Sequence, residues 1–209
     1  MFLFDWFRSI LQYFGFINTK CNLLILGLHD AGKSTLLSRL KDGRLVQHTP
    51  TNHPWSEEFT VGKVTFEVYD LGGHILALSF WRRYIPAVKG IVFIVDASDS
   101  QSLPEARQEL TSILTDEDVS DVPVLVLGNK IDKRGCYGKE QLIKELGIDQ
   151  HLSNSVNTED KSGIRPCTLV MSSLLHQTGY GDGLKWMATQ IHEEDRINNN
   201  STTVTVTSS

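Results

Sequence analysis

Eight residues near the start of the chain have the types and the spacing of a phosphate-binding loop. Residues 27–34 (GLHDAGKS) fit the pattern G-x-x-x-x-G-K-[ST]. The two glycines let the backbone turn tightly, so that successive N–H groups and the start of the following helix point at an anion. In such a loop Lys33 reaches the terminal phosphates and the Ser34 hydroxyl binds Mg²⁺. The pattern predicts a nucleoside triphosphate site; the alternative is a plain glycine turn between a strand and a helix.

The residues on either side supply the elements that must position this loop. Residues 21–26 form a short apolar run that is typical of a buried strand. Leu36, Leu37 and Leu40 have helical spacing, and Asp42-Gly43 ends the helix that we expect over 33–41. A strand, a glycine-rich loop and a helix in this order are the context that favours a phosphate site over a plain turn.

A second motif, D-x-x-G followed by histidine at residues 70–74, comes directly after a strand-like run at 64–69. An aspartate at the carboxyl end of a buried strand beside a phosphate-binding loop can hold the outer shell of Mg²⁺. D-x-x-G is a weak motif alone, and its position after the phosphate-binding loop makes it stronger. We therefore expect Asp70 to belong to the same site.

A third motif indicates which base is bound. Asn129-Lys130-Ile131-Asp132 follows an apolar run at 122–127. The Asp132 carboxylate can accept hydrogen bonds from both the ring N–H and the exocyclic amine of guanine, whereas adenine offers no such pair of donors. Asn129 can bond the N7 side of the base, and the stem of Lys130 can lie along it. The motif predicts guanine; the alternative is a polar loop between a strand and a helix.

Strand-like and helix-like runs alternate along the rest of the chain. Besides the segments above, we expect strands at 58–61, 90–97 and 167–171, and helices at 102–114, 139–146 and 182–194. The continuous apolar runs at 90–97 and 122–127 are typical of strands buried on both faces, as in a parallel sheet covered by helices. The prediction is an α/β fold with a six-stranded, mostly parallel sheet flanked by helices on both faces. Residues 44–56 and 147–166 are polar and are expected to be loops.

Composition bounds the class of protein. The 209 residues carry a net charge of −5, which argues against a nucleic-acid partner. The 3 cysteines contain no C-x-x-C pair, which suits a reducing compartment and suggests neither zinc nor disulfides. No apolar run reaches the roughly 18 residues of a membrane span.

The first residues form a possible anchor of another kind. Residues 1–16 place large apolar side chains at helical spacing, opposite a small polar face. We expect an amphipathic helix that lies in a membrane interface, and the alternative is a helix packed on the domain. Residue 2 is Phe, which excludes N-myristoylation. The residues expected to enter the membrane are Phe2, Leu3, Phe4, Trp6, Phe7, Ile10 and Leu11. The expected organisation is this helix and a connector at 1–20, a GTP-binding domain at 21–196 and a disordered tail at 197–209.

The motifs together resemble those of a Ras-like small GTPase with a P-loop fold. The features that narrow the resemblance to Sar-type GTPases of the COPII vesicle coat, in the Arf/Sar branch, are DLGGH at 70–74, His53-Pro54 with SEE at 56–58, LGNKID at 127–132 and GYGDG at 179–183 before Trp186. The resemblance covers about residues 1–195.

This resemblance implies roles for individual residues. Those assigned to GTP or GDP are Asp30, Ala31, Gly32, Lys33, Ser34, Thr35, Asn129, Lys130, Asp132, Ser173 and Leu174. Those assigned to the cofactor Mg²⁺ are Ser34, Thr51 and Asp70. Those assigned to catalysis are Lys33, Gly73, whose amide senses the γ-phosphate, and His74, which orients the attacking water. The alternative for His74 is a surface histidine at a helix start.

It also implies a cellular role. GTP binding would release the first helix into the endoplasmic reticulum membrane and recruit the inner-shell subunits of the COPII coat, one of which is the GTPase-activating protein. An exchange factor resident in the endoplasmic reticulum would load GTP. The chain would act on the cytosolic face of the endoplasmic reticulum and Golgi membranes, and it would hydrolyse GTP slowly by itself, because no arginine is an evident finger in cis.

Two departures from the family pattern keep a second hypothesis open. His29-Asp30 stands where the family usually has Asp-Asn, and the bulk of His29 can crowd the γ-phosphate. The usual polar sequence after His74 is replaced by the apolar run ILALSF at 75–80. The second hypothesis is a diverged module that binds GTP and a membrane or partner but hydrolyses GTP poorly. A P-loop kinase would have no use for residues 129–132.

Overall fold

The computed structural model describes residues 21–41, 47–48, 56–61, 64–69, 88–152 and 165–205. The described elements are, in chain order, β1 (Cys21–Gly27), α2 (Lys33–Lys41), β2 (Gln47–His48), β3 (Ser56–Val61), β4 (Val64–Tyr69), β5 (Val88–Asp96), α4 (Leu103–Leu114), the short 3₁₀ helix η2 (Glu117–Val119), β6 (Val124–Asn129), α5 (Lys139–Leu146), β7 (Cys167–Met171) and α6 (Tyr180–Thr205). Strands and helices alternate, as expected for an α/β fold.

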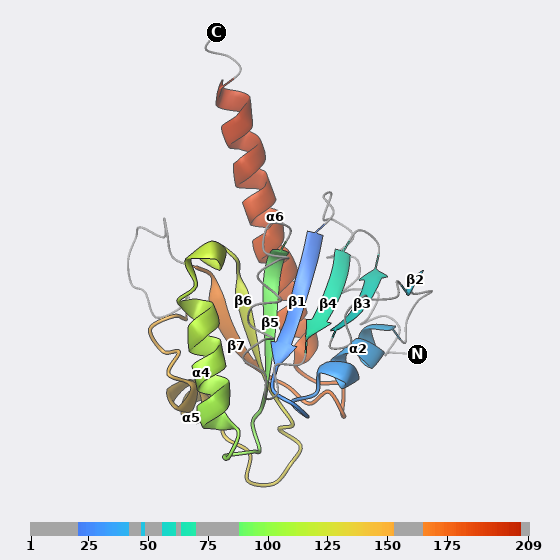
Figure 1. Cartoon of the computed structure of the whole chain (residues 1–209), viewed down its shortest axis with the longest axis vertical. Coiled ribbons are helices and arrows are strands. Elements are labelled where there is room, and N and C mark those ends of the chain that lie inside the picture. Colours follow the sequence, from blue (N-terminus) through green and yellow to red (C-terminus); the bar gives the residue numbers. More distant parts are fainter. Residues whose placement is uncertain are drawn as a thin grey trace.

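The strands form one sheet in the order β2-β3-β4-β1-β5-β6-β7 (Figure 1). The five strands from β4 to β7 in this order run parallel, and β3 pairs antiparallel with β4 and with β2. The predicted α/β fold with a mostly parallel sheet is confirmed. The carboxyl ends of the parallel strands meet at one edge, where open α/β sheets bind their ligands.

The prediction of six strands is corrected, because the sheet has seven strands in the described residues alone. The additional strand is β2, which has 2 residues and lies within the segment 44–56 that we expected to be a loop. Its partners in β3 are Thr60 and Phe59. A pair of residues is too short to show the alternation that identifies a strand in a sequence, so this edge strand leaves no signal.

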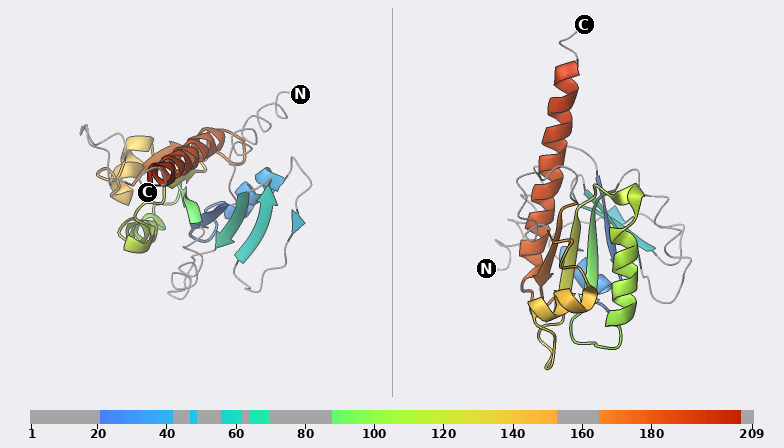
Figure 2. Two further views of the ribbon diagram at one scale, coloured as in Figure 1. Left: turned by 90° about the horizontal axis from the view of Figure 1, so that it is seen from above. Right: turned by 90° about the vertical axis from the view of Figure 1, so that its left-hand side faces the viewer.

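Helices cover both faces of the sheet, as predicted. Seen from above in Figure 2, α4 and α6 lie on opposite sides of the strands. Successive side chains of a strand point to opposite faces, and in β1 Leu23 and Ile25 join the cluster formed with α2 and α6, whereas Leu24 and Leu26 join the cluster formed with α4 and α5. All four side chains are fully buried. A continuous apolar run is therefore what this central strand requires.

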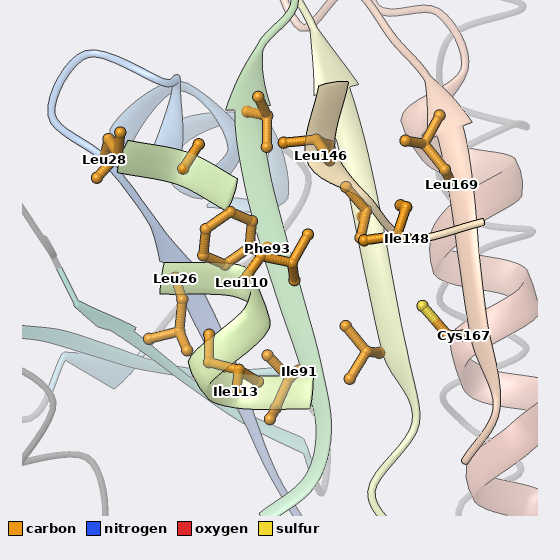
Figure 3. Close-up of a cluster of buried hydrophobic side chains, with 14 of the residues drawn as sticks. Leu26, Leu28, Ile91, Phe93, Leu110, Ile113, Leu146, Ile148, Cys167 and Leu169 are labelled. Carbon is orange, nitrogen blue, oxygen red and sulfur yellow. The ribbon is translucent and has the colours of Figure 1, made fainter. Parts of the chain in front are cut away.

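The second cluster shows how firmly α4 and α5 are held against the sheet (Figure 3). Phe93 of β5 lies between strand neighbours and Leu110 of α4, and Leu146 of α5 packs in the same layer. The whole set labelled in Figure 3 is Leu26, Leu28, Ile91, Phe93, Leu110, Ile113, Leu146, Ile148, Cys167 and Leu169. This packing fixes the strand ends that carry the site.

The last helix is longer than expected. We predicted a helix at 182–194 and a disordered tail at 197–209, but α6 continues through Thr205 and has 26 residues. Its last turns extend beyond the sheet, at the end away from the strand tips that face α2 (Figure 1). The helix thus includes residues 197–205 of the segment for which we expected disorder. A helix already nucleated by packed turns gains one hydrogen bond for each residue it adds, so weak helix formers can prolong it.

Two expectations cannot be compared with the fold. The amphipathic helix at 1–16 and the apolar run at 75–80 lie outside the described residues. Within the described residues, none of the helices has the length and apolar character needed to cross a membrane.

Candidate nucleotide-binding site

The phosphate-binding loop connects the end of β1 to the start of α2. Gly27 has φ 149° and Gly32 has φ 115°, which are conformations that favour glycine. A Cβ atom on Gly27 would lie 2.4 Å from the carbonyl oxygen of Ile94, and one on Gly32 would lie 2.3 Å from Nδ2 of Asn129. Both glycines of the motif are therefore required by close approach as well as by backbone conformation.

Lys33 is placed where a phosphate-binding lysine is needed. It is 7% exposed, and its Nζ donates to the carbonyl oxygens of Gly27 at 2.8 Å and Leu28 at 2.6 Å. The side chain thus folds back along the loop from the first residue of α2, the end of a helix that favours negative charge. An anion held by the loop would meet both the ammonium group and the helix N-terminus.

Asn129, the last residue of β6, joins this loop to the far side of the site. It is 3% exposed, and its Nδ2 donates to the Ala31 carbonyl oxygen at 2.9 Å. Its Oδ1 accepts from the Leu174 backbone N–H at 3.0 Å. The sequence predicted that Asn129 contacts the base; the structure adds that it connects the phosphate-binding loop to the loop after β7.

Lys130 forms an ionic bridge beside the same loop. Its Nζ lies 3.0 Å from Oδ2 of Asp30 and 2.8 Å from Oδ2 of Asp96. Burial alone would lower the pKa of Lys130, but hydrogen bonds to Asp96 and Asp30 outweigh burial and raise it. Burial would raise the pKa of Asp96, yet its hydrogen bonds with Lys130 and Ser98 lower it. The bridge is therefore charged at neutral pH.

The sequence analysis did not identify Asp96. A signal was present, because Asp96 follows the apolar run at 90–95 and pairs in register with Asn129 of the neighbouring strand. Two polar residues at adjacent strand tips face the same edge of a parallel sheet.

Asp132 is oriented by a serine from another loop. The Ser173 hydroxyl donates to Oδ1 of Asp132, and this hydrogen bond lowers the pKa of Asp132. Ser173 is 2% exposed, and its Oγ also accepts from the His176 backbone N–H at 3.1 Å. Asp132 itself is exposed. An ionised, exposed carboxylate with a fixed orientation is an acceptor suited to a pair of N–H donors.

The loop after β7 receives one further contact, from α2. Nε of Arg39 donates to the Leu174 carbonyl oxygen at 3.2 Å, and Nη2 donates to the Leu175 carbonyl oxygen at 3.3 Å. No sequence pattern connects residues this far apart in the chain, so sequence reasoning missed Arg39.

The predicted nucleotide-binding residues therefore surround one edge of the sheet. The predicted residues that the structure brings together are Asp30, Ala31, Gly32, Lys33, Ser34, Thr35, Asn129, Lys130, Asp132, Ser173 and Leu174. The predicted residues outside the described part of the chain are Thr51, Asp70, Gly73 and His74, together with those expected to enter a membrane.

Of the three residues predicted to bind magnesium, Ser34 lies in the described part of the chain. Ser34 lies in the first turn of α2 and is exposed, so its hydroxyl is accessible to a cation next to the phosphate-binding loop. In the described ranges, no three or more His, Cys, Asp and Glu side chains gather in a group that could hold a metal ion.

Comparison with known proteins yields one family. The sequence model of the ADP-ribosylation factor (Arf) family matches residues 7–191. The small COPII coat GTPase SAR1 of Giardia intestinalis is 35% identical over 184 residues, which cover 88% of this chain and 96% of that protein. The small COPII coat GTPase SAR1B of Dictyostelium discoideum is 41% identical over 191 residues, covering 90% of this chain and 95% of that protein.

A solved structure has the same fold. It is the ADP-ribosylation factor-like GTP-binding protein, or small COPII coat GTPase SAR1, of Encephalitozoon cuniculi in complex with GDP. The TM-score is 0.76 at 26% sequence identity, and the match covers 95% of this chain and 92% of that one.

Proposed function

The chain belongs to the Arf family of small GTPases, and from that premise we propose that it is a Sar-type switch of COPII vesicle traffic. Members of the Arf/Sar branch hydrolyse GTP to GDP and phosphate, and this chain is a GTPase of that branch. The proposal concerns how the described site holds the nucleotide and what the two nucleotide states do.

The observation that carries the proposal is the position of Asn129. Its amide group connects the carbonyl of Ala31 in the phosphate-binding loop to the backbone N–H of Leu174. One side chain therefore joins the phosphate-binding loop to the loop after β7. In the proposal these two loops hold the phosphate end and the base end of the same nucleotide. In the proposal the phosphates lie against residues 28–34 with Lys33, and guanine is read by Asp132.

Mg²⁺ is the cofactor that these residues fit. Bound magnesium neutralises the charge that develops between the β- and γ-phosphates. The exposed Ser34 hydroxyl would supply one oxygen to it. The sequence assigns Thr51 and Asp70 to the same ion, and it assigns the γ-phosphate contact to Gly73 and the orientation of water to His74. These four assignments are part of the proposal and rest on the motifs alone.

The membrane and coat roles rest on the relatives and on the first 16 residues. Two relatives similar over most of their length are named small COPII coat GTPases. In the proposal, GTP releases the apolar face of residues 1–16 into the membrane of the endoplasmic reticulum, and the bound state recruits coat subunits, including the GTPase-activating one. An exchange factor on that membrane would restore GTP.

Single-turnover hydrolysis of preloaded GTP tests the switch. We expect slow hydrolysis by the wild type, strong stimulation by the coat's GTPase-activating subunit, and loss of that stimulation in His74→Leu. Flotation of the same protein on liposomes, with GDP and with a non-hydrolysable GTP analogue, tests the membrane step. Tight GTP binding without turnover under any condition would instead favour the GTP-binding module that hydrolyses poorly.

A further inference from the structure

Arg39 connects the two ends of the nucleotide site. It lies on α2, the helix whose first turn carries Lys33 and Ser34. From there its guanidinium donates to two consecutive carbonyl oxygens of the loop after β7, those of Leu174 at 3.2 Å and Leu175 at 3.3 Å. A planar guanidinium presents its donors in a rigid fork, so two adjacent carbonyls held by different nitrogens are fixed in orientation as well as in position.

The loop that Arg39 holds is the loop that orients the base-reading side chains. The Leu174 N–H donates to Oδ1 of Asn129, and the Ser173 hydroxyl donates to the carboxylate of Asp132. The loop is a tight turn closed by paired backbone hydrogen bonds between Ser173 and Thr178, both 3.0 Å long. A shift of Leu174 would therefore move the groups on which Asn129 and Asp132 depend.

The packing around this contact is uneven. The Leu174 side chain is 1% exposed and belongs to the cluster that contains Leu36 and Leu37 of α2. The next residue, Leu175, is 65% exposed, so its side chain contributes little packing. On this outer part of the loop the polar contact with Arg39 takes the place of apolar packing.

We infer that Arg39 is a positioning residue for guanine recognition, which acts through Leu174 and Leu175 on Asn129 and Asp132. The inference rests on the proposed function, because it assigns to Arg39 a role in the same site. A purely structural role would make Arg39 support the fold without affecting which base is bound.

Equilibrium binding of GDP and ADP to the full chain separates these two roles. The two nucleotides share ribose and phosphates and differ in the base, so ADP reports the phosphate end alone. In Arg39→Met, which keeps a long stem but has no donor, we expect the Kd for GDP to rise about tenfold, since hydrogen bonds to a charged group are lost. The Kd for ADP should stay unchanged, so the preference for GDP should narrow about tenfold.

Two further variants complete the test. Arg39→Lys keeps the positive charge but loses the paired donors of the guanidinium. It should also reduce the preference for GDP over ADP, by a smaller factor than Arg39→Met. Arg134→Met removes an exposed arginine shortly after Asp132 and should leave both constants unchanged. The inference would be overturned if the ratio of the Kd for ADP to the Kd for GDP stayed unchanged in both Arg39 variants. That holds whether neither constant changes or both rise by the same factor. Failure of the proposed function would look different, because the wild type itself would then not prefer GDP.

Discussion

Ser172 and Ser173 are neighbours at the end of β7, and both are buried, but their hydroxyl groups have opposite surroundings. The Ser173 hydroxyl donates to Asp132 and accepts from the backbone of His176. The Ser172 hydroxyl is fully buried and has no hydrogen-bond partner in the part of the chain that the structure describes. Ser173 therefore orients the carboxylate to which we assign guanine recognition, whereas Ser172 buries a hydroxyl without a partner among the described residues.

This contrast predicts opposite outcomes for two alanine substitutions. Ser173→Ala should weaken GDP binding about fivefold to tenfold, because Asp132 loses the donor that orients it. Ser172→Ala should change the free energy of unfolding by less than about 0.5 kcal/mol, because an unsatisfied polar group is removed. Calorimetric titration with GDP and chemical denaturation measure the two effects. A larger loss of GDP affinity in Ser172→Ala than in Ser173→Ala would contradict this assignment.

Cys136 and Cys167 are both thiols outside any disulfide, and their surroundings predict different reactivities. Burial raises the pKa of Cys167 to about 12, so its thiol is protonated and inaccessible well above neutral pH. Cys136 is partly exposed, and its Sγ lies 3.4 Å from the Ile131 carbonyl oxygen near the base-reading motif.

At pH 8 in the native state, iodoacetamide should alkylate Cys136 and leave Cys167 unmodified, as read for each residue by peptide mass spectrometry. Adding denaturant is the control, and it should expose Cys167 to the reagent. Bound GDP should slow the alkylation of Cys136, because its loop is then held by the base. Rapid native labelling of Cys167 would show that β7 is less well packed than described.

At the scale of elements, Arg165 fastens the end of α4 to the start of β7. Its guanidinium donates to the carbonyl oxygens of Ile113 at 2.8 Å, Ser120 at 3.0 Å and Asp116 at 3.2 Å, and also to that of Val119. Burial lowers the pKa of Arg165, but a guanidinium group is so basic that it remains charged at neutral pH. A positive charge near the C-terminus of α4 also interacts favourably with the helix dipole.

Arg165→Met should therefore lower the free energy of unfolding by about 2 to 3 kcal/mol, because several carbonyls lose a charged donor. The matched control is Arg107→Met, which removes an exposed arginine from α4 and should cost less than about 1 kcal/mol. Urea denaturation followed by circular dichroism measures both. Equal effects of the two substitutions would mean that the Arg165 contacts add no stability of their own.

The elements that could be predicted from sequence are those with a strong pattern. The prediction of a strand at 21–26 agrees with β1 at Cys21–Gly27, and the predicted helix at 139–146 coincides with α5. A fully buried strand requires an unbroken apolar run, and a surface helix requires apolar residues on one side. The edge strand β2 has only 2 residues, and the last part of α6 is a polar sequence without apolar residues at regular helical spacing, so neither shows such a pattern.

In the candidate site, too, local motifs could be predicted from the sequence and contacts between distant residues could not. The motifs at 27–34 and 129–132 could be recognised because phosphate and guanine each demand particular side chains at a fixed local spacing. The contacts of Asn129 with Ala31 and of Arg39 with Leu174 join residues far apart in the chain. Such contacts are consequences of strand order, and no local pattern encodes them.

At the scale of the whole molecule, the parallel sheet brings the tips of β1, β5, β6 and β7 to one edge (Figure 1). The phosphate-binding loop, the Lys130 bridge and the loop after β7 all lie there, connected by the Asn129 amide. The last turns of α6 extend beyond the opposite end of the sheet (Figure 1). The described side chains of the candidate site thus gather at one end of the sheet.

The central claim is that this edge selects guanine through the carboxylate of Asp132, and a change of base preference tests it most directly. Asp132→Asn exchanges an acceptor for a group that also donates, so it no longer suits the two donors of guanine but can donate to the carbonyl oxygen that xanthine carries instead of the amine. We predict that the wild type binds GDP at least about 100-fold more tightly than xanthosine diphosphate, and that Asp132→Asn reverses this order. A wild type that binds both nucleotides equally, or a variant that keeps the preference for GDP, would contradict the account.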